Sequence, residues 1–254
     1  MYYNNEFCNL YFEKYGDKKD TLIILPGWGD NRNSFHHIID YFKDKFTIYI
    51  FDYPGFGKTK SPKKEMTIYD YASMINNFIE DYNIENPIIL AHSFGGRISI
   101  LLSAIHKVNI KKLILIDVAG IKPRKTLKQL LKQTSYKLKR QLSKLIKEKE
   151  KRENYLTNLR KKHSSSDYLL LPENMHQTFK NIVNENLKKY IKYIKEETLI
   201  LWGEHDLDTP LKDAMYLNKK IKNSALITLP RAGHFSYIEY RELTINIIEK
   251  FILE

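Results

Sequence analysis

Short apolar runs alternate with longer segments of helical period along most of this chain, and this alternation limits its possible folds more than any other feature. Six runs are rich in β-branched and other apolar residues, at residues 21–25, 46–51, 87–91, 112–117, 198–202 and 225–229. Continuous apolar runs of this length are typical of strands that are buried on both faces. Segments long enough for helices lie between or after them, at residues 34–42, 67–81, 95–106, 210–220 and about 237–253. The sequence therefore predicts an α/β fold with a mostly parallel sheet flanked by helices.

The alternation is interrupted once, over residues 121–196, where the pattern is helical and contains no convincing strand. Because predicted strands of one sheet precede and follow this block, we expect a helical cap inserted after the sixth strand of the fold. The predicted domains are a core of residues 1–120 and 197–254 and a cap (lid) of residues 121–196. Near the N-terminus, residues 9–20 are expected to add an antiparallel edge strand.

The formal net charge of +12 arises almost entirely from one part of this insertion. Residues 121–162 contain sixteen Lys and Arg against three Glu, a balance of +13, so the rest of the chain is about neutral. Few aromatic residues and no recognition motif accompany these cations, so we expect no nucleic-acid partner. The sequence predicts neither a signal peptide nor a membrane span, and we expect a cytoplasmic location. Cys8 is the only cysteine, which excludes an internal disulfide.

A serine stands at the corner between a predicted strand and the next helix, in the stretch NPIILAHSFGGRIS of residues 86–99. In an open α/β sheet, ligands bind beyond the carboxyl ends of the strands, where Ser93 is expected. A tight strand–turn–helix corner needs small neighbours, and Ala91, Gly95 and Gly96 meet that need. The next helix would also direct backbone donors at an oxyanion. Ser93 is therefore a candidate nucleophile, and a helix N-cap is its alternative role.

A nucleophilic serine needs a base to take its proton and an acid to orient that base. His234, in LPRAGHFSYIE, follows the last predicted strand, and Asp206, in LWGEHDLDTP, follows the strand before it. Both are expected at the same sheet edge as Ser93, in the chain order Ser, Asp, His. Asp117, which also ends a strand, and Asp208 are alternative acids. For all three carboxylates, helix capping or loop hydrogen bonding is the other interpretation.

The other histidines are not expected to act as the base. His92 and His205 also lie on turns at this edge, but they adjoin Ser93 and Asp206 in sequence and are expected to point elsewhere. The rest are interpreted as ordinary surface or packing residues, and they are His36, His37, His106, His163 and His176.

Taken together, these motifs resemble those of α/β-hydrolase fold enzymes with a helical cap, from about Thr21 to the C-terminus. AHSFGG resembles the nucleophile elbow G-x-S-x-G-G, LPGWGD the oxyanion loop H-G-x-G, and FDYPGFGKTKSP the stretch D-x-x-G-x-G-x-S. WGEHDLDTP and AGHF resemble the acid and histidine loops, and the G-x-x-D spacing of the family favours Asp206 as the acid. Ala91 replaces the first glycine of the elbow and Pro26 replaces the usual histidine of the oxyanion loop. Neither replacement removes a chemical group.

The resemblance implies a serine hydrolase that acts on an ester or related small-molecule acyl substrate through an acyl-enzyme intermediate. Ser93 would be the nucleophile, His234 the base and Asp206 the acid, with the backbone N–H groups of Trp28 and Phe94 as the oxyanion hole. No metal or organic cofactor is expected. One alternative keeps the triad for carbon–carbon bond hydrolysis, lyase or cofactor-free haloperoxidase chemistry. The other is a non-enzymatic ligand-binding homologue.

Leucines recur at helical spacing within TLKQLLKQTSYKLKRQLSKLI, residues 126–146, against a lysine-rich surface. One interpretation is a lid whose apolar face covers the mouth of the active site. The other is a basic amphipathic helix that contacts an anionic membrane surface weakly or lies over an acidic substrate. Further along the chain, Tyr168, Met175 and Phe179 are candidate pocket walls.

Overall fold

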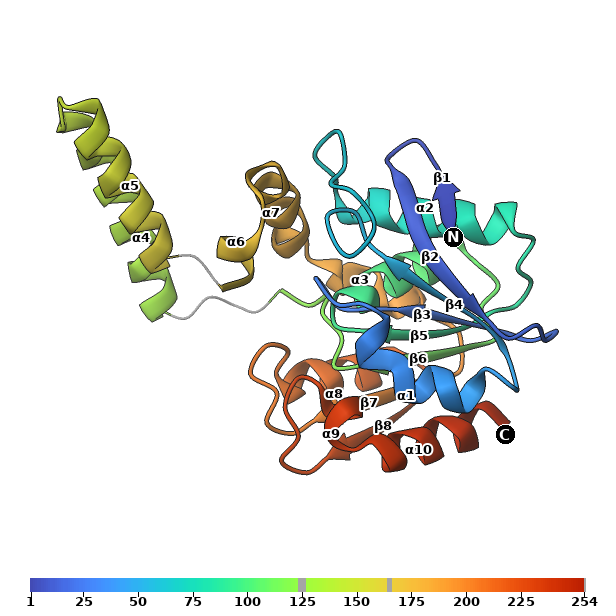
Figure 1. Ribbon diagram of the computed structural model, residues 1–254. Helices are drawn as coiled ribbons and strands as arrows, with labels where there is room; N and C mark the ends of the chain where they lie inside the picture. Colours follow the sequence, from blue (N-terminus) through green and yellow to red (C-terminus); the bar gives the residue numbers. More distant parts are fainter. Residues whose placement is uncertain (123–126, 164–165, 254) are drawn as a thin grey trace. The chain divides into compact units, whose positions relative to one another are not determined.

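One eight-stranded sheet organises the larger part of the chain (Figure 1). The computed structural model describes residues 1–122, 127–163 and 166–253. The spatial order of the strands is β1-β2-β4-β3-β5-β6-β7-β8; β1, β2 and β4 pair antiparallel, and every other pair is parallel. The strands are β1 (Tyr2–Asn4), β2 (Asn9–Tyr15), β3 (Thr21–Leu25), β4 (Thr47–Asp52), β5 (Ile88–His92), β6 (Lys112–Ile116), β7 (Thr198–Gly203) and β8 (Ser224–Leu229). The predicted α/β fold with a mostly parallel sheet is confirmed.

The prediction of an edge strand near the N-terminus needs a correction. The strand β2 lies between β1 and β4 and pairs antiparallel with both, so that Tyr3 faces Leu10 and Tyr11 faces Asp52 across the ladders. The edge strand is β1. With three residues, β1 is too short to show a period in the sequence.

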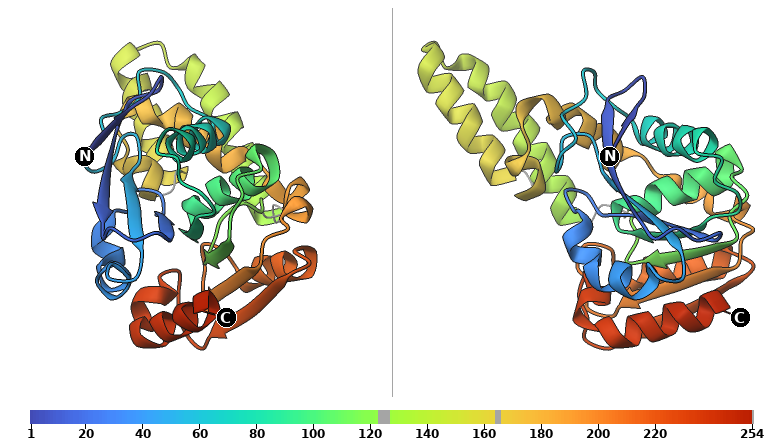
Figure 2. Two further views of the ribbon diagram at one scale, coloured as in Figure 1. Left: turned by 90° about the vertical axis from the view of Figure 1, so that its right-hand side faces the viewer. Right: turned by 45° about the vertical axis from the view of Figure 1, so that its right-hand side comes forward.

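The two faces of the sheet bury alternate side chains of the same strands, as the pleat requires. Along β3, Ile23 and Leu25 belong to one core cluster, whereas Leu22 and Ile24 belong to the other. The first cluster includes residues of α2 (Ile68–Asp81), α3 (Phe94–Leu101) and α8 (Leu211–Lys220), and the second includes residues of α1 (Arg32–Phe42), α9 (Ser236–Glu239) and α10 (Arg241–Leu253). Figure 2 shows this layered arrangement from two further sides. The predicted coverage of both faces is therefore confirmed.

The helices begin and end close to the predicted positions, with two differences. The segment predicted as one helix over residues 95–106 ends as α3 at Leu101 and continues as a π-helical turn over Leu102–His106. The C-terminal helical run is divided at Tyr240 into α9 and α10. In the parts of the chain that the structure describes, no helix has both the length and the apolar character that crossing a bilayer requires.

The insertion between β6 and β7 contains α4 (Leu127–Leu142), α5 (Lys149–His163), α6 (Ser166–Leu170) and α7 (His176–Asn184). The chain divides into two compact units, one of residues 1–122 and 180–254 and the other of residues 123–179. Residues 180–196, which the sequence assigned to the cap, thus belong with the sheet. The Leu187 amide donates to Gly120 O at 2.9 Å, and Ile191 and Ile194 are buried in the core. The lid role predicted for residues 121–196 stays a prediction.

Candidate active site

Ser93 occupies the tight turn between β5 and α3, and its backbone conformation is strained. Its φ of 47° and ψ of −111° lie in a region that residues other than glycine rarely adopt. The Ser93 amide donates to Ile116 O at 3.2 Å, and the Ala119 amide donates to Ser93 O at 2.9 Å. The Ser93 side chain forms no capping hydrogen bond with α3, which argues against the N-cap alternative. These contacts fix Ser93 at the carboxyl edge of the sheet.

Two glycines allow this turn to pack closely against its neighbours. A Cβ atom at Gly95 would lie 2.0 Å from the backbone oxygen of Leu25, and one at Gly96 would lie 2.2 Å from Cβ of Val118. Real Cβ contacts are never this short, so no side chain fits at either position. The predicted need for small residues behind Ser93 is therefore confirmed.

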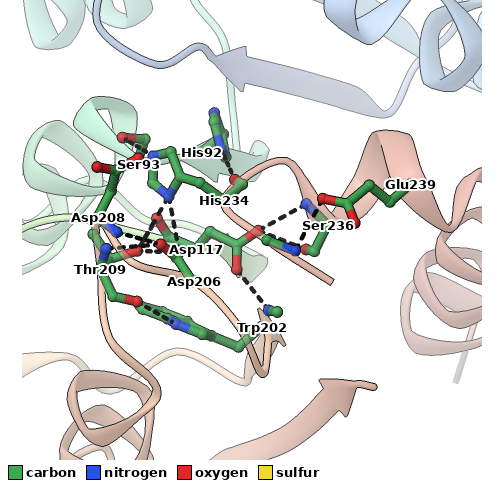
Figure 3. A network of polar contacts seen from close by, with 12 residues as sticks. His92, Ser93, Asp117, Trp202, Asp206, Asp208, Thr209, His234, Ser236 and Glu239 are labelled. Atoms are coloured by element: carbon green, nitrogen blue, oxygen red, sulfur yellow. Dashed lines mark hydrogen bonds and ion pairs between the residues drawn. The ribbon is translucent and has the colours of Figure 1, made fainter. Parts of the chain in front are cut away.

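Ser93, His234 and Asp206 form one continuous chain of hydrogen bonds (Figure 3). Ser93 Oγ lies 2.9 Å from His234 Nε2, and His234 Nδ1 lies 2.8 Å from Asp206 Oδ2. Because a carboxylate only accepts, Nδ1 carries the proton and Nε2 is free to accept from the serine hydroxyl. The structure therefore brings together the three residues that the sequence singled out, from turns that follow β5, β7 and β8.

Burial and hydrogen bonding oppose each other in setting the pKa values of the acid and the base. Burial alone would raise the pKa of Asp206, but hydrogen bonds from His234 and Thr209 outweigh it and lower that pKa. Burial alone would lower the pKa of His234, but the hydrogen bond to Asp206 and its negative charge raise it. Asp206 is thus held ionised, and a protonated His234 is stabilised. A base that must take a proton from a hydroxyl requires this arrangement.

Thr209 positions Asp206 and was not among the site residues predicted from the sequence. Its hydroxyl donates to Asp206 Oδ2 at 2.5 Å, and its amide donates to Oδ1 at 2.9 Å. The Asp208 amide donates to the same Oδ1 at 2.8 Å. An aspartate whose side chain accepts hydrogen bonds from the amides two and three residues further along the chain forms an Asx-type turn. The pattern D-x-D-T is the sequence signal for this turn.

Asp117, the alternative acid, is fully buried and bonded to other groups. Its Oδ1 accepts from the Gly203 amide at 2.8 Å, and its Oδ2 accepts from the amide and the hydroxyl of Ser236 at 3.2 and 2.5 Å. Burial raises the pKa of this carboxyl to about 7. Asp117, which follows β6, is therefore bonded to the last residue of β7 and to the first residue of α9, while His234 bonds to Asp206.

The acid, the base and a neighbouring aspartate form a group that could hold a metal ion. Among the described residues, Asp206, Asp208 and His234 each offer one ligand atom, and these atoms lie within 4.8 Å of one another. Two of the three groups are already paired, since His234 Nδ1 and Asp206 Oδ2 are hydrogen-bonded to each other. The cluster is thus arranged as a hydrogen-bonded acid and base.

The loop after β3 lies beside Ser93, as an oxyanion loop would. A Cβ atom on Gly27 would lie 3.4 Å from Cβ of Ser93, and the Trp28 ring packs edge-on against the Phe94 ring at 5.1 Å between centroids. Phe94 begins α3, so its N–H belongs to the first turn, where amides lack partners within the helix. The Phe94 side chain is buried in the core cluster. An oxyanion role for the N–H groups of Trp28 and Phe94 stays a proposal.

The candidate pocket walls belong to the unit of residues 123–179. Within that unit Tyr168 stacks on His176 with ring centroids 4.1 Å apart and lies 6.1 Å from the Phe179 ring. Met175 is fully buried. The role of Tyr168, Met175 and Phe179 as pocket walls stays a prediction.

Comparisons with known proteins agree with this geometry. The family model described as the alpha/beta hydrolase fold matches residues 20–240. A Mycoplasma pneumoniae protein with the provisional name esterase/lipase 2 is 24% identical over 257 residues, which cover 98% of this chain and 95% of that protein. The pimeloyl-acyl-carrier-protein methyl ester esterase of Wigglesworthia glossinidia brevipalpis is 26% identical over 261 residues, which cover 93% of this chain and 95% of that protein. An α/β hydrolase enzyme from a Medee basin deep-sea metagenome library has a TM-score of 0.77 at 19% identity, and the match covers 100% of this chain and 98% of that one. The chain therefore belongs to the α/β-hydrolase fold family and is a hydrolase enzyme.

Proposed function

We propose that this hydrolase cleaves an ester or a related acyl bond through a covalent acyl-enzyme on Ser93. The observation that supports it most is the hydrogen-bonded chain from Ser93 through His234 to Asp206 on a strained turn. A serine hydroxyl is a weak nucleophile by itself and becomes reactive when a neighbouring base removes its proton. The 2.9 Å contact between Ser93 Oγ and His234 Nε2 allows that transfer.

In the first half of the proposed reaction, Ser93 Oγ attacks the carbonyl carbon while His234 Nε2 takes the hydroxyl proton. The negative charge moves to the carbonyl oxygen, which would accept hydrogen bonds from the N–H groups of Trp28 and Phe94. When the oxyanion collapses, the bond to the leaving oxygen breaks and His234 returns the proton to the departing alcohol. Asp206 stabilises the protonated imidazole throughout.

In the second half, water hydrolyses the acyl-enzyme. His234 Nε2 takes a proton from the water, the hydroxide oxygen attacks the acyl carbon, and the proton then passes to Ser93 Oγ as the acid leaves. The names of the relatives favour ester chemistry over carbon–carbon hydrolysis, lyase or haloperoxidase chemistry, since one is a methyl ester esterase and another is named esterase/lipase. A non-enzymatic binding protein would have no use for a strained serine joined to a base and an acid. A small-molecule acyl substrate and a cytoplasmic location stay predictions from the sequence.

Substitutions at the two aspartates distinguish the proposed acid from its alternative. On a series of p-nitrophenyl esters of increasing acyl length, Ser93→Ala should lower kcat roughly a millionfold and Asp206→Asn roughly ten-thousandfold. Asp117→Asn should mainly lower the melting temperature, because it disturbs the hydrogen bonds from Gly203 and Ser236. If Asp117→Asn matched the expected Asp206→Asn loss while Asp206→Asn stayed near wild type, the acid would be Asp117. If the wild-type protein hydrolysed none of the esters, ester cleavage itself would be wrong.

The pH dependence of kcat/KM reports the protonation of His234. Only the neutral imidazole can accept the Ser93 proton, so hydrolysis should increase with pH as His234 loses its own proton. Because Asp206 raises the pKa of His234, the midpoint should lie above the value of about 6.5 for an ordinary histidine. Asp206→Asn should move this midpoint to lower pH while it slows the reaction. A flat profile from about pH 5 to 8 would show that His234 is not the base.

A further inference from the structure

His92 lies directly before Ser93 and reaches the loop that carries His234. Its Nε2 atom lies 2.9 Å from the backbone oxygen of His234 (Figure 3). Since a carbonyl oxygen only accepts, Nε2 carries the proton and donates this bond. From its place in the sequence, His92 is expected to point elsewhere. Instead it connects the turn of the proposed nucleophile to the backbone of the proposed base.

The imidazole of His92 is buried and neutral, and this hydrogen bond fixes its tautomer. Burial, with a smaller contribution from the nearby His234, lowers the pKa of His92 to about 3. Its other nitrogen, Nδ1, is buried and has no hydrogen-bond partner among the described residues. The rings of Tyr237 and Phe235 lie 4.9 and 5.2 Å from the His92 ring, so apolar packing surrounds it. The bond to His234 is thus the polar contact that orients the ring.

The same ring also lies against the loop after β3. A Cβ atom on Gly27 would lie 3.0 Å from His92 Nδ1, which leaves room there for glycine alone unless the ring moves. His92 therefore contacts three segments of the candidate site. It is covalently joined to Ser93, hydrogen-bonded to the backbone of His234 and packed beside the residue that precedes Trp28.

We propose that His92 is a positioning residue whose Nε2–H holds the backbone of His234 so that the imidazole stays within reach of Ser93. The proposal rests on the serine hydrolase function proposed above. The hydrogen bonds to Asp206 and Ser93 orient the His234 ring, but they leave its backbone free to shift. A displacement of about 1 Å at a reacting group can cost roughly a hundredfold in rate. The bond from His92 opposes such a displacement.

The test compares a variant that removes the donor with one that keeps it. His92→Phe retains a ring without the N–H and should lower kcat roughly a hundredfold, with KM little changed. His92→Gln places an amide N–H near the same carbonyl and should restore most of the loss. His37→Phe is the matched control, because His37 Nε2 also bonds to a backbone oxygen of this region, that of Tyr237 at 3.1 Å. It should lower the melting temperature and leave kcat unchanged.

Wild-type kcat in His92→Phe would overturn the proposal, as would equal losses of kcat in His92→Phe, His92→Gln and His37→Phe. An NMR readout separates this failure from failure of the proposed function. The imidazole signals of His234 should change in His92→Phe and not in His37→Phe, whether or not the protein cleaves any ester. Unchanged His234 signals in His92→Phe would refute the positioning role, whereas absent esterase activity in the wild type would refute the function alone.

A second, independent inference concerns α4 and the turn that follows it, in the unit of residues 123–179. Leu131, Leu138, Leu142 and Leu145 are 71%, 55%, 52% and 76% exposed. Their separations of seven, four and three residues place them along one face of a helix. A row of large apolar side chains that their own unit leaves uncovered marks a binding surface. We refer to these four residues as the leucine stripe.

The charges around the leucine stripe indicate what it binds. Residues 127–145 contain six Lys and Arg and no Asp or Glu. Lys137 and Lys139 adjoin Leu138 in sequence, Lys144 adjoins Leu145, and all three lysines are exposed. On a helix such neighbours lie to either side of the stripe, where their alkyl stems can follow the leucines and their ammonium groups can reach past them. Apolar side chains flanked by cations complement the acyl chains and head groups of an anionic lipid surface.

We infer that the leucine stripe docks on an anionic lipid surface.

Wild-type protein should sediment at low salt with vesicles of phosphatidylcholine and phosphatidylglycerol but not with phosphatidylcholine alone, and binding should weaken as salt screens the charges. Replacing Lys137, Lys139 and Lys144 by Gln should abolish sedimentation and leave turnover of a short ester unchanged. Replacing Lys60, Lys63 and Lys64 by Gln removes the same charge elsewhere and should leave sedimentation intact. Equal binding to both vesicle types, or to neither, would overturn the inference. If the wild-type protein were a dimer and Leu138→Ser made it a monomer, the leucine stripe would bind a second copy of this chain instead.

Discussion

The site depends on the tight backbone turn at Ser93, which packs so closely against its neighbours that Gly95 and Gly96 have no room for side chains. Ser93 can take its strained conformation because Gly95 lies against the backbone of Leu25 and Gly96 against Val118, in neighbouring parts of the sheet layer. These contacts tie the position of the serine oxygen to the position of the parallel strands. Loops that leave the same sheet edge can then bring a base and an acid to that oxygen, although they come from distant parts of the chain. The geometry at Ser93 is therefore a consequence of the core packing.

Two aspartates at this edge have different chemistry because different groups donate to them. Asp206 accepts hydrogen bonds from His234 and Thr209, and these bonds keep its pKa low despite burial. Asp117 is buried more completely, and its pKa is raised to about 7. A low pKa suits a carboxylate that must stay charged beside an imidazolium, whereas the Asp117 carboxyl joins the turn after β6 to the end of β7 and the start of α9. Burial alone would have made the two residues alike.

Much of this arrangement could be predicted from the sequence, because it depends on local pattern. The apolar runs predicted the central strands, and small residues around Ser93 predicted the tight turn. The contribution of His92 could not be predicted, because its partner is a backbone oxygen 142 residues away and backbone oxygens carry no sequence signal. The place of residues 180–196 in the larger unit, rather than in the cap, could not be predicted for a related reason. Their helical pattern resembles that of the insertion, and only the contacts of Leu187, Ile191 and Ile194 with the core show where they belong.

The central claim is that Ser93 is a nucleophile activated by His234, and covalent labelling tests it most directly. A fluorophosphonate probe reacts with activated serines, and mass spectrometry of the digested protein identifies the residue that carries it. We expect the label on Ser93 alone in the wild type, and almost none in His234→Ala at the same time and concentration, although Ser93 is still present. Labelling of another serine, or labelling of Ser93 at the wild-type rate in His234→Ala, would contradict the account.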